Sequence, residues 1–537
     1  MNGADAIIKC LEHEKVEVVY GYPGVAICPF YNSILKSDIK TVLVRTEQNA
    51  AHAASGMTRT SGKPGVCAVT SGPGATNLIT GIATAFADSI PLVCITGQVT
   101  TDLLGSDGFQ EADITGAVES FVKYSYLVRD VNDIPRIFKE AFYIANSGRK
   151  GPVLIDIPFD IQNAEIKKYS YPDDVKLRTY KPTVKGNALQ IKRVIKELEK
   201  AKKPVICAGG GVILSDATDE LRTFVEEYNI PVVSTMMGIS AMPTRHPLYF
   251  GMVGNNGCYE ANRAIKEADL LIMVGARVAD RAVNQPDKIT NGKVLVHIDV
   301  DPAEIGKNAG FSIPIVGDAA SIFKDFNEYE IDGDFSNWVK VLNNYSKEMT
   351  TGRRANKDYC DPKEFIEMLS ENMEDDAIYV ADVGQNQIFS CKYHVVKNGR
   401  FITTGGMGTM GYSIPAAMGA KYGSPKKQVV AVCGDGSFQM SMMELATIRQ
   451  HNIPVKIIIF RNNYLGLVRQ YQHYNYDDNY SVVNLDGSPD IEQLAAAYGI
   501  KYIKLENMKN AQKAIKTFLE KDEAYIMECL IDPMDVV

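Results

Sequence analysis

A continuous apolar run ends abruptly in a glycine-rich acidic sequence near residue 434. The run is Val429 to Cys433, and Gly434-Asp435-Gly436-Ser437 follows it directly. Such a run is typical of a strand that is buried on both faces, as in a parallel sheet covered by helices. An amphipathic helix is predicted at Met440 to Arg449, and a second apolar strand at Val455 to Phe460 then leads to Asn462. Two neighbouring parallel strands are therefore expected to bring Asp435 and Asn462 to the same edge of one sheet.

These residue types suit a bound diphosphate and its metal ion. Two glycines allow a tight turn that brings backbone N–H groups close to a phosphate, and Asp435 offers a hard oxygen ligand for Mg²⁺. Gly-Asp-Gly is also a common turn after a strand. The position of Asn462 after the next strand favours the metal site over the simple turn.

Strand and helix patterns alternate along the whole chain, which predicts an α/β fold with three doubly wound parallel-sheet domains. The predicted domains are residues 1–165, 186–330 and 356–537, with polar connectors at 164–185 and 327–355. The predicted strands are Glu17–Tyr20, Thr41–Val44, Gly65–Thr70, Leu92–Thr96, Val153–Ile157, Pro204–Ala208, Pro231–Thr235, Ala268–Val274, Lys293–Ile298, Ala377–Val383, Phe401–Thr404, Gln428–Cys433, Val455–Phe460 and Ala524–Ile531.

Composition narrows the class of protein. The 537 residues carry a net charge of −8 and have no long basic cluster, so neither nucleic acid nor a membrane is expected as a partner. The N-terminus begins directly with an amphipathic helix pattern, which is unlike a signal or transit peptide. The ten cysteines include no Cys-x-x-Cys pair. We expect a cytoplasmic protein with reduced thiols and no structural zinc.

The segment from Gly434 onward, with its continuation Tyr464-Leu465-Gly466-Leu467-Val468-Arg469-Gln470, resembles the motif of thiamine diphosphate-dependent enzymes, and specifically of the acetolactate synthase family. The resemblance covers nearly the whole chain. It implies thiamine diphosphate and Mg²⁺ as cofactors. The implied metal ligands are Asp435, Asn462 and the main-chain carbonyl of Tyr464. The residues implied for the diphosphate end are Val383, Gly384, Gln385, Asn386, Gly434, Asp435, Gly436, Ser437, Asn462 and Tyr464.

Glu47 follows a predicted strand and should lie at the ligand-binding edge of its sheet. A glutamate there is often only a surface residue or a helix cap, but Thr70-Ser71-Gly72-Pro73-Gly74-Ala75-Thr76-Asn77 resembles the family's pyrimidine-domain signature and implies that Glu47 is the catalytic acid. Such an acid is needed because the cofactor's 4′-amino group can remove the thiazolium proton only when N1′ is protonated or hydrogen-bonded. In a dry site the pKa of a glutamate is raised, and it can serve at neutral pH.

Further cofactor contacts come from the resemblance. The carbonyl of Gly408 would accept from the 4′-amino group, and Met410 would lie between the cofactor's two rings; an ordinary core methionine is the alternative. Glu47 and the Gly434 sequence belong to different predicted domains, and in the family they come from two subunits. We therefore expect a homodimer, or a dimer of dimers, with active sites at the subunit interface.

The remaining implied residues concern substrate and flavin. Gly24, Val25 and Gln110 are predicted to act at the reacting centre, and Arg281, Tyr471, Phe109 and Lys123 are predicted to contact 2-oxo acid substrates. Arginine suits a carboxylate because its planar fork makes two bonds. The middle domain resembles the FAD-carrying domain of these synthases, where FAD is structural rather than redox-active. The implied flavin contacts are Gly209, Gly210, Gly211, Gly251, Arg277, Asp299 and Asp318.

Some positions depart from the family pattern. Valine or alanine stands at Val25, Val253 and Ala279, where the family has glycine, histidine and aspartate. The other departures are Thr46 and Asn386 for histidines, Arg461 for the first asparagine of the metal motif, and Tyr471 for a tryptophan that favours 2-oxobutyrate. The chain also stops at Val537, short of the family's usual tail. These changes alter the pocket walls but leave Glu47, Asp435 and Asn462.

The predicted function is an acetolactate synthase that decarboxylates pyruvate and transfers the hydroxyethyl group to pyruvate or 2-oxobutyrate, in branched-chain amino acid biosynthesis. A regulatory small subunit is a possible partner. The alternatives are a 2-oxo acid decarboxylase or an acyloin-type ligase with another acceptor, a catalytically silent assembly partner, and a flavin oxidase.

Overall fold

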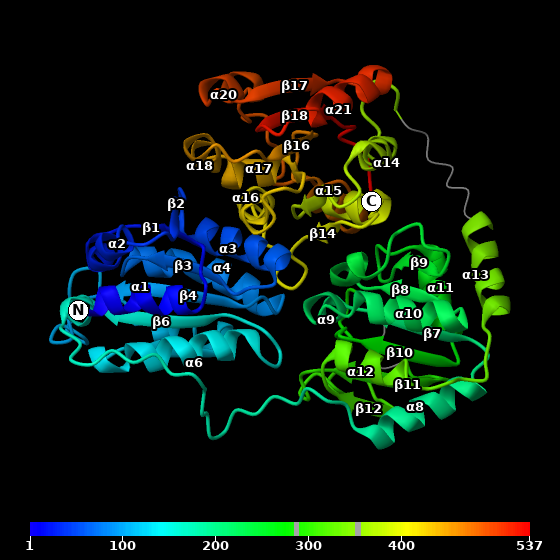
Figure 1. Cartoon of the computed structure of the whole chain (residues 1–537). Coiled ribbons are helices and arrows are strands. Elements are labelled where there is room, and N and C mark those ends of the chain that lie inside the picture. The colour runs from blue at the N-terminus through cyan, green and yellow to red at the C-terminus, as the bar shows by residue number, and fades with distance from the viewer. Residues whose placement is uncertain (284–288, 349–355) are drawn as a thin grey trace.

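In the computed structural model, which describes residues 1–283, 289–348 and 356–537, the chain forms three sheets, each built from six strands. All pairings between these strands are parallel, and helices lie between most successive strands (Figure 1). The predicted α/β class with three parallel sheets is confirmed. The predicted domain boundaries remain a prediction, although each sheet lies within one of the three ranges.

The first sheet has the strand order β2-β1-β3-β4-β6-β5. Its strands are β1 (Val18–Tyr22), β2 (Lys40–Leu43), β3 (Gly65–Val69), β4 (Leu92–Gln98), β5 (Tyr124–Leu127) and β6 (Val153–Pro158). Its helices are α1 (Gly3–His13), α2 (Cys28–Ile34), α3 (Glu47–Ser61), α4 (Pro73–Ala87), α5 (Ile114–Ala117), α6 (Ile134–Asn146) and α7 (Phe159–Asn163). β3 and β4 are buried along their whole length, as their apolar sequences predicted.

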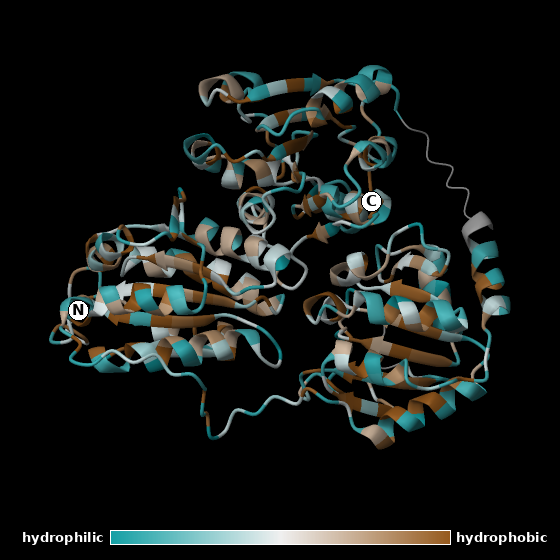
Figure 2. Ribbon diagram, in the orientation of Figure 1, coloured by the Kyte–Doolittle hydropathy of each residue, from teal (hydrophilic) through white to brown (hydrophobic). Residues whose placement is uncertain are grey.

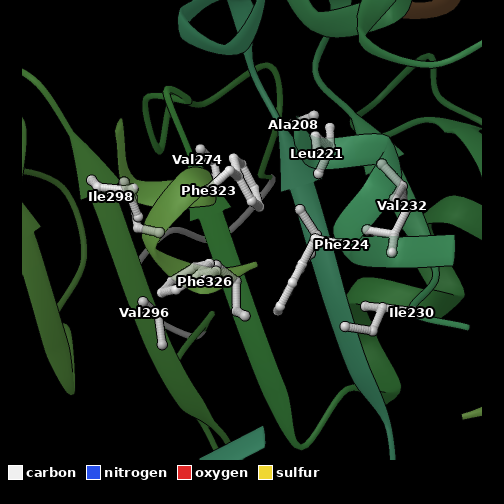
Figure 3. Close-up of a cluster of buried hydrophobic side chains, with 14 of the residues drawn as sticks. Ala208, Leu221, Phe224, Ile230, Val232, Val274, Val296, Ile298, Phe323 and Phe326 are labelled. Carbon is white, nitrogen blue, oxygen red and sulfur yellow. The ribbon is translucent and has the colours of Figure 1, made fainter. Parts of the chain in front are cut away.

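The second sheet has the order β12-β11-β10-β7-β8-β9. Its strands are β7 (Pro204–Ala208), β8 (Val232–Ser234), β9 (Tyr249–Met252), β10 (Leu270–Val274), β11 (Val294–Asp299) and β12 (Ile313–Val316). Its helices are α8 (Ala188–Lys200), α9 (Gly210–Leu214), α10 (Thr218–Tyr228), α11 (Tyr259–Glu267), α12 (Ala319–Phe326) and α13 (Ser336–Glu348). Figure 3 shows Phe224 of α10 close to Phe326 of α12 over these strands, and their ring centroids are 5.4 Å apart.

The third sheet has the order β14-β13-β15-β16-β18-β17. Its strands are β13 (Ile378–Ala381), β14 (Arg400–Ile402), β15 (Val429–Gly434), β16 (Lys456–Arg461), β17 (Lys501–Leu505) and β18 (Tyr525–Leu530). Its helices are α14 (Pro362–Asn372), α15 (Gln385–Tyr393), α16 (Ser413–Gly423), α17 (Asp435–Ser441), α18 (Glu444–His451), α19 (Gly466–Asn475), α20 (Ile491–Ala497) and α21 (Ala511–Leu519). β15 and β16 are direct neighbours with Gly434 opposite Phe460, as predicted.

The hydropathy of the ribbon follows this layering. In Figure 2 the strands are mainly hydrophobic, while hydrophilic residues lie on the outer faces of helices such as α8. On α8 the buried residues are Ile191, Val194, Ile195 and Leu198, which recur at helical spacing. Burial of such faces is what holds the helices against the sheets.

Two helix predictions need correction. The helix predicted at Met440–Arg449 is two helices, α17 and α18, and α17 begins directly at Asp435 rather than after a glycine loop. The connector predicted at 327–355 contains α13, whose Trp338 and Leu342 are buried in the central core. The end of that connector, 349–355, lies outside the described residues.

The first and third domains pack directly on each other through α3 and α16, which lie side by side in Figure 1. The helices approach closely at Gly56, where a Cβ atom would come 1.9 Å from the carbonyl oxygen of Ala416. Asn49 of α3 also donates to Glu444 of α18 at 2.8 Å. The small residues of α3 thus allow two domains to share one rigid contact.

Candidate active site and flavin cavity

Glu47 is the first residue of α3 and follows β2 at the edge of the first sheet. Asn77 of α4 donates from Nδ2 to Oε2 of Glu47 at 3.0 Å. A Cβ at Gly74 would lie 3.3 Å from Oε1 of Glu47, so this glycine leaves space beside the carboxylate. The Thr70–Asn77 segment therefore holds the glutamate, as its position in the sequence suggested.

Two loops meet beside this glutamate. Gly24 packs so closely on Thr70 that a Cβ on Gly24 would lie 2.6 Å from the Thr70 side chain. Gly72 packs equally closely on Gln110, because a Cβ on Gly72 would lie 2.8 Å from the carbonyl oxygen of Gln110. Gln110 itself has a φ of 58°, so its loop turns sharply at that point. Gly24, Glu47 and Gln110 thus belong to one cluster, the N-terminal half-site.

The apolar residues of this half-site face outward. Val25 is 76% exposed and Phe109 is 89% exposed. Large apolar side chains exposed together at one site indicate a surface that a partner or a ligand covers.

A buried polar network supports the Gln110 loop from below. Gln98 donates from Nε2 to Asp156 Oδ2 at 3.0 Å and to the carbonyl of Ala112 at 2.8 Å. Thr96 donates to the other oxygen of Asp156 at 2.6 Å. Burial raises the pKa of Asp156 to about 7, although the hydrogen bonds from Thr96 and Gln98 favour the charged form and lower the pKa. Sequence reasoning missed this network, although an aspartate inside the apolar strand Val153–Pro158 was a visible signal.

The C-terminal half-site is built at the ends of β15 and β16. Asp435 is 3% exposed and accepts from the backbone N–H of Asn463 at 2.7 Å and of Gly436 at 3.1 Å. Burial raises its pKa to about 6, with these N–H groups opposing the shift. Among the described residues no lysine, arginine or histidine forms an ion pair with Asp435. A buried carboxylate in that state is suited to a bound cation.

Asn462 lies beside Asp435 and is nearly buried. Its Oδ1 accepts from the N–H of Tyr464 at 2.9 Å, and its Nδ2 donates to Gln385 at 3.3 Å. Gln385 begins α15 after β13, so the Val383–Asn386 sequence meets the metal motif here. Among the described residues, no three His, Cys, Asp or Glu side chains lie together so that they could hold a metal ion. The predicted donor set of Asp435, Asn462 and the carbonyl of Tyr464 contains only one side chain of these types.

The other predicted diphosphate residues surround the same point. Gly384 has a φ of 136°, which only glycine adopts readily, and Ser437 donates to the carbonyl of Gly434 at 3.2 Å. The methyl group of Met410 would lie 3.7 Å from a Cβ at Gly436. Asn386 instead turns its amide inward and donates to the carbonyl of Asp382 at 2.8 Å. The structure thus gives Asn386 a supporting place within the half-site.

A cavity of about 410 Å³ lies between all three domains. Predicted residues that line it are Gly210, Gly211, Arg277, Arg281, Asp299, Asp318 and Gly408. Gly209 lies behind this wall, since its Cβ would come 2.1 Å from the carbonyl oxygen of Gly275, and Gly251 borders Cys258 rather than the cavity. The central-domain residues therefore converge on one elongated space whose far end reaches Gly408, two residues from Met410.

The chemistry of this wall fits a flavin dinucleotide. Arg277 would supply positive charge to a diphosphate, whereas Arg149 already pairs with Asp301 at 3.2 Å and Glu304 at 2.8 Å. Asp299 is a strand-end carboxylate whose pKa burial raises to about 6. The hydroxyl of Thr404 lines the cavity, is buried and has no hydrogen-bond partner, so it lacks the contact that a ligand would supply. Arg149 and Thr404 were not predicted; the Gly148-Arg149-Lys150-Gly151 sequence before β6 was the available signal for the first.

Two predicted substrate residues, Lys123 and Tyr471, do not line this cavity. Lys123 donates to the carbonyl oxygens of Ile144 and Ser147 and to the hydroxyl of Tyr180, the last at 2.8 Å. It therefore ties the end of α6 to Tyr180, near the end of the 164–185 connector, and the structure gives it no place at either half-site. Tyr471 is 59% exposed on α19, the helix that follows the metal motif.

Arg281 lines the cavity, but its guanidinium is mainly in solvent and lies 3.6 Å from Asp280. It is therefore available for a ligand carboxylate. No helix among the described residues is both long and apolar enough to cross a membrane.

The fold and these two half-sites define the class of thiamine diphosphate-binding α/β proteins. Three family models match the chain: the thiamine pyrophosphate enzyme N-terminal TPP-binding domain at residues 1–117, the central domain at 191–326 and the C-terminal TPP-binding domain at 382–529. At 44% identity, 99% of the chain aligns with 92% of a probable acetolactate synthase large subunit of Methanococcus aeolicus. The whole chain aligns with 93% of the acetolactate synthase large subunit of Lactococcus lactis at 43% identity, and with 96% of that of Haemophilus influenzae at 40%. The chain belongs to the acetolactate synthase large-subunit family of thiamine pyrophosphate enzymes.

Proposed function

We propose that the protein is an acetolactate synthase, which decarboxylates pyruvate and transfers the resulting two-carbon unit to a second 2-oxo acid. The observation that carries the proposal is that Glu47, Asp435 and Asn462 each stand in a formed half-site of a chain that aligns over its full length with named acetolactate synthases. When bound, thiamine diphosphate supplies the electron sink for cleaving the carbon–carbon bond.

The two half-sites would contact opposite ends of the cofactor. Glu47 would hold a proton at the pyrimidine nitrogen N1′, and Asn77 orients its carboxylate for this role. Asp435, Asn462 and the carbonyl of Tyr464 would hold Mg²⁺, which neutralises the diphosphate. Gln110 would donate a hydrogen bond to the reacting oxygen, and Val25 would exclude water from the same point once a second copy covers it.

A second copy of the chain is needed to complete the site. In one chain, the contacts between the first and third domains run through α3, α16 and α18 and through residues 405–409 beside Asp88. None of these segments carries Val25, Phe109 or Tyr471. The exposed apolar residues of both half-sites are Val25, Phe109, Met407, Met440, Val468 and Tyr471. A homodimer that joins the N-terminal half-site of one copy to the C-terminal half-site of the other would cover them.

FAD is proposed as a resident, non-redox cofactor of the central cavity. Support comes from Arg277 and Asp299, which line the cavity at the carboxyl ends of β10 and β11, and from Arg149 of the first domain, which lines it from the loop before β6. Gly408 also lines this cavity, which supports a flavin ring near the thiamine diphosphate site. The protein's part would be to bind and orient the ring.

Pyruvate and 2-oxobutyrate are the proposed acceptors, with Arg281 binding the carboxylate through its guanidinium fork. The large-subunit names of the relatives support a regulatory small subunit as a partner. The ten cysteines, with no Cys-x-x-Cys pair, support a cytoplasmic location with reduced thiols.

Product analysis tests the proposal. The protein is incubated with thiamine diphosphate, Mg²⁺ and pyruvate, with and without 2-oxobutyrate, and the products are identified. Acetolactate and acetohydroxybutyrate support a synthase. Acetaldehyde alone would make it a decarboxylase, and the absence of cofactor binding in calorimetry would make it a silent homologue.

A further inference from the structure

A chain of contacts runs from a buried glutamate to the predicted metal carboxylate. Arg461, the last residue of β16, donates from Nη1 to Glu528 Oε1 at 2.8 Å and from Nε to Asn463 Oδ1 at 2.8 Å. The backbone N–H of Asn463 then donates to Asp435 Oδ2 at 2.7 Å. One guanidinium group therefore connects the neighbouring strand β18 to the residue that holds Asp435.

Asn463 needs support because of its backbone conformation. Its φ of 58° lies in the left-handed region, which asparagine tolerates better than most residues but not without cost. The bond from Arg461 to its side chain fixes the residue in this conformation, in which its N–H is directed at Asp435. Without that bond, the peptide can relax and the carboxylate of Asp435 can turn.

The guanidinium of Arg461 is fixed in its turn. Glu528 is 2% exposed, and its second oxygen accepts from the hydroxyl of Tyr502 on β17. Both oxygens of Glu528 are thus occupied by donors, so the carboxylate cannot rotate away from Arg461. Side chains on the neighbouring strands β18 and β17 thus hold the guanidinium group of Arg461, at the end of β16, in one orientation.

We propose that Arg461, held by Glu528 and Tyr502, is a positioning residue for the divalent-cation site, and that it sets the orientation of the Asp435 carboxylate through Asn463. The proposal rests on the proposed function in so far as that function places Mg²⁺ at Asp435. A residue that orients a metal ligand typically changes metal affinity by roughly tenfold to a hundredfold when it is removed.

The first test is Asn463→Gly. Glycine keeps the backbone N–H and folds without strain in the left-handed conformation, but it also adopts many others. Without the side-chain oxygen that Arg461 holds, nothing then fixes the N–H toward Asp435. The Arg461–Glu528 ion pair stays intact. We expect the Mg²⁺ dissociation constant, measured by calorimetry with excess thiamine diphosphate, to rise by about tenfold. The thermal midpoint of the metal-free protein should stay close to that of the parent.

The second test removes the ion pair as a unit. Arg461→Met alone would leave Glu528 buried and unpaired, so it is combined with Glu528→Gln, which can still accept from Tyr502. We expect the same rise in the Mg²⁺ dissociation constant. The matched control replaces a remote ion pair of 3.3 Å in the central domain, with Lys203→Met and Glu267→Gln, and should leave Mg²⁺ binding unchanged.

Parental Mg²⁺ affinity in Asn463→Gly overturns the proposal, and so does parental affinity in the double variant. If the double variant does not fold, Asn463→Gly decides the matter alone. Failure of the proposed function is recognised separately, because the parent protein itself would then bind no Mg²⁺ with thiamine diphosphate in the same titration.

Discussion

The side-chain amide of Asn77 donates a 3.0 Å hydrogen bond to Oε2 of Glu47, which joins the N-termini of α4 and α3. The bond leaves the other oxygen of Glu47 beside Gly74, where no side chain intrudes. The glutamate is thereby oriented while one oxygen stays available to a ligand. This arrangement suits an acid that must meet a single nitrogen atom.

Glu47→Gln should therefore abolish most of the activity. The amide keeps the shape and can still accept from Asn77, but it cannot give up a proton, and general acid catalysis is worth roughly 10²–10⁴ in rate. Acetolactate formation measures the loss, and the thermal midpoint should be unchanged. Turnover near the parental rate would contradict the role of Glu47.

The buried Asp156 predicts a specific dependence of stability on pH. Its folded pKa of about 7 lies above its usual value, so its contribution to stability is fully present at acidic pH and is lost as pH rises through 7. The cost at alkaline pH is on the order of a few kcal/mol. Asp156→Asn keeps an acceptor for Gln98 and carries no charge.

The variant should therefore unfold at a higher temperature than the parent at about pH 8, and the difference should shrink toward about pH 5. Thermal unfolding of both proteins across this range measures it. A difference that does not change with pH would show that Asp156 is not held neutral by burial.

Arg277→Gln should weaken flavin binding. Arg277 lines the central cavity, and loss of its charge removes a charge-assisted bond to the flavin diphosphate. The parent is expected to carry the visible flavin absorption band after purification, and the variant should lose most of it on dialysis. Arg222→Gln on α10 is the control, since Arg222 is not among the residues that line the cavity. Equal retention of flavin in parent and Arg277→Gln would contradict the assignment.

Tyr471→Trp should shift the choice of acceptor. The larger ring adds apolar contact for the extra methylene of 2-oxobutyrate, a change worth about 1–3 kcal/mol in discrimination. Competition between pyruvate and 2-oxobutyrate, with both products measured, should show relatively more acetohydroxybutyrate. An unchanged product ratio would place Tyr471 outside the acceptor pocket.

Strands with continuous apolar sequences were predicted well, whereas only two of the edge strands, β2 and β14, were predicted. β3, β7, β15 and β16 are buried on both faces, so burial alone gives their position. The missed strands are β5, β9, β12 and β17. β5, β9, β12 and β17 all lie at or next to the edges of their sheets; β5 and β17 are also largely exposed, so their polar residues hide the pattern.

In the candidate site, too, residues that follow strands were predicted, whereas contacts between distant segments were not. Glu47, Asp435 and Asn462 follow apolar strands, and the carboxyl ends of parallel strands bring such residues to one edge. Glu444 was not predicted as a link between domains, because its partner Asn49 is 395 positions away in the sequence. Likewise nothing local shows that Arg461 would reach Glu528 on another strand. Contacts of this kind depend on how the domains and strands pack.

The central claim is that one active site takes Glu47 from one subunit and Asp435 from another. Mixing the two inactive variants Glu47→Gln and Asp435→Asn under conditions that exchange subunits tests it directly. About half of the dimers become hybrids, and each hybrid has one site with both native residues. The account predicts recovery of about a quarter of the parental activity in acetolactate formation. No recovery, with hybrid dimers demonstrated, would mean that both residues serve the same chain and would contradict the account.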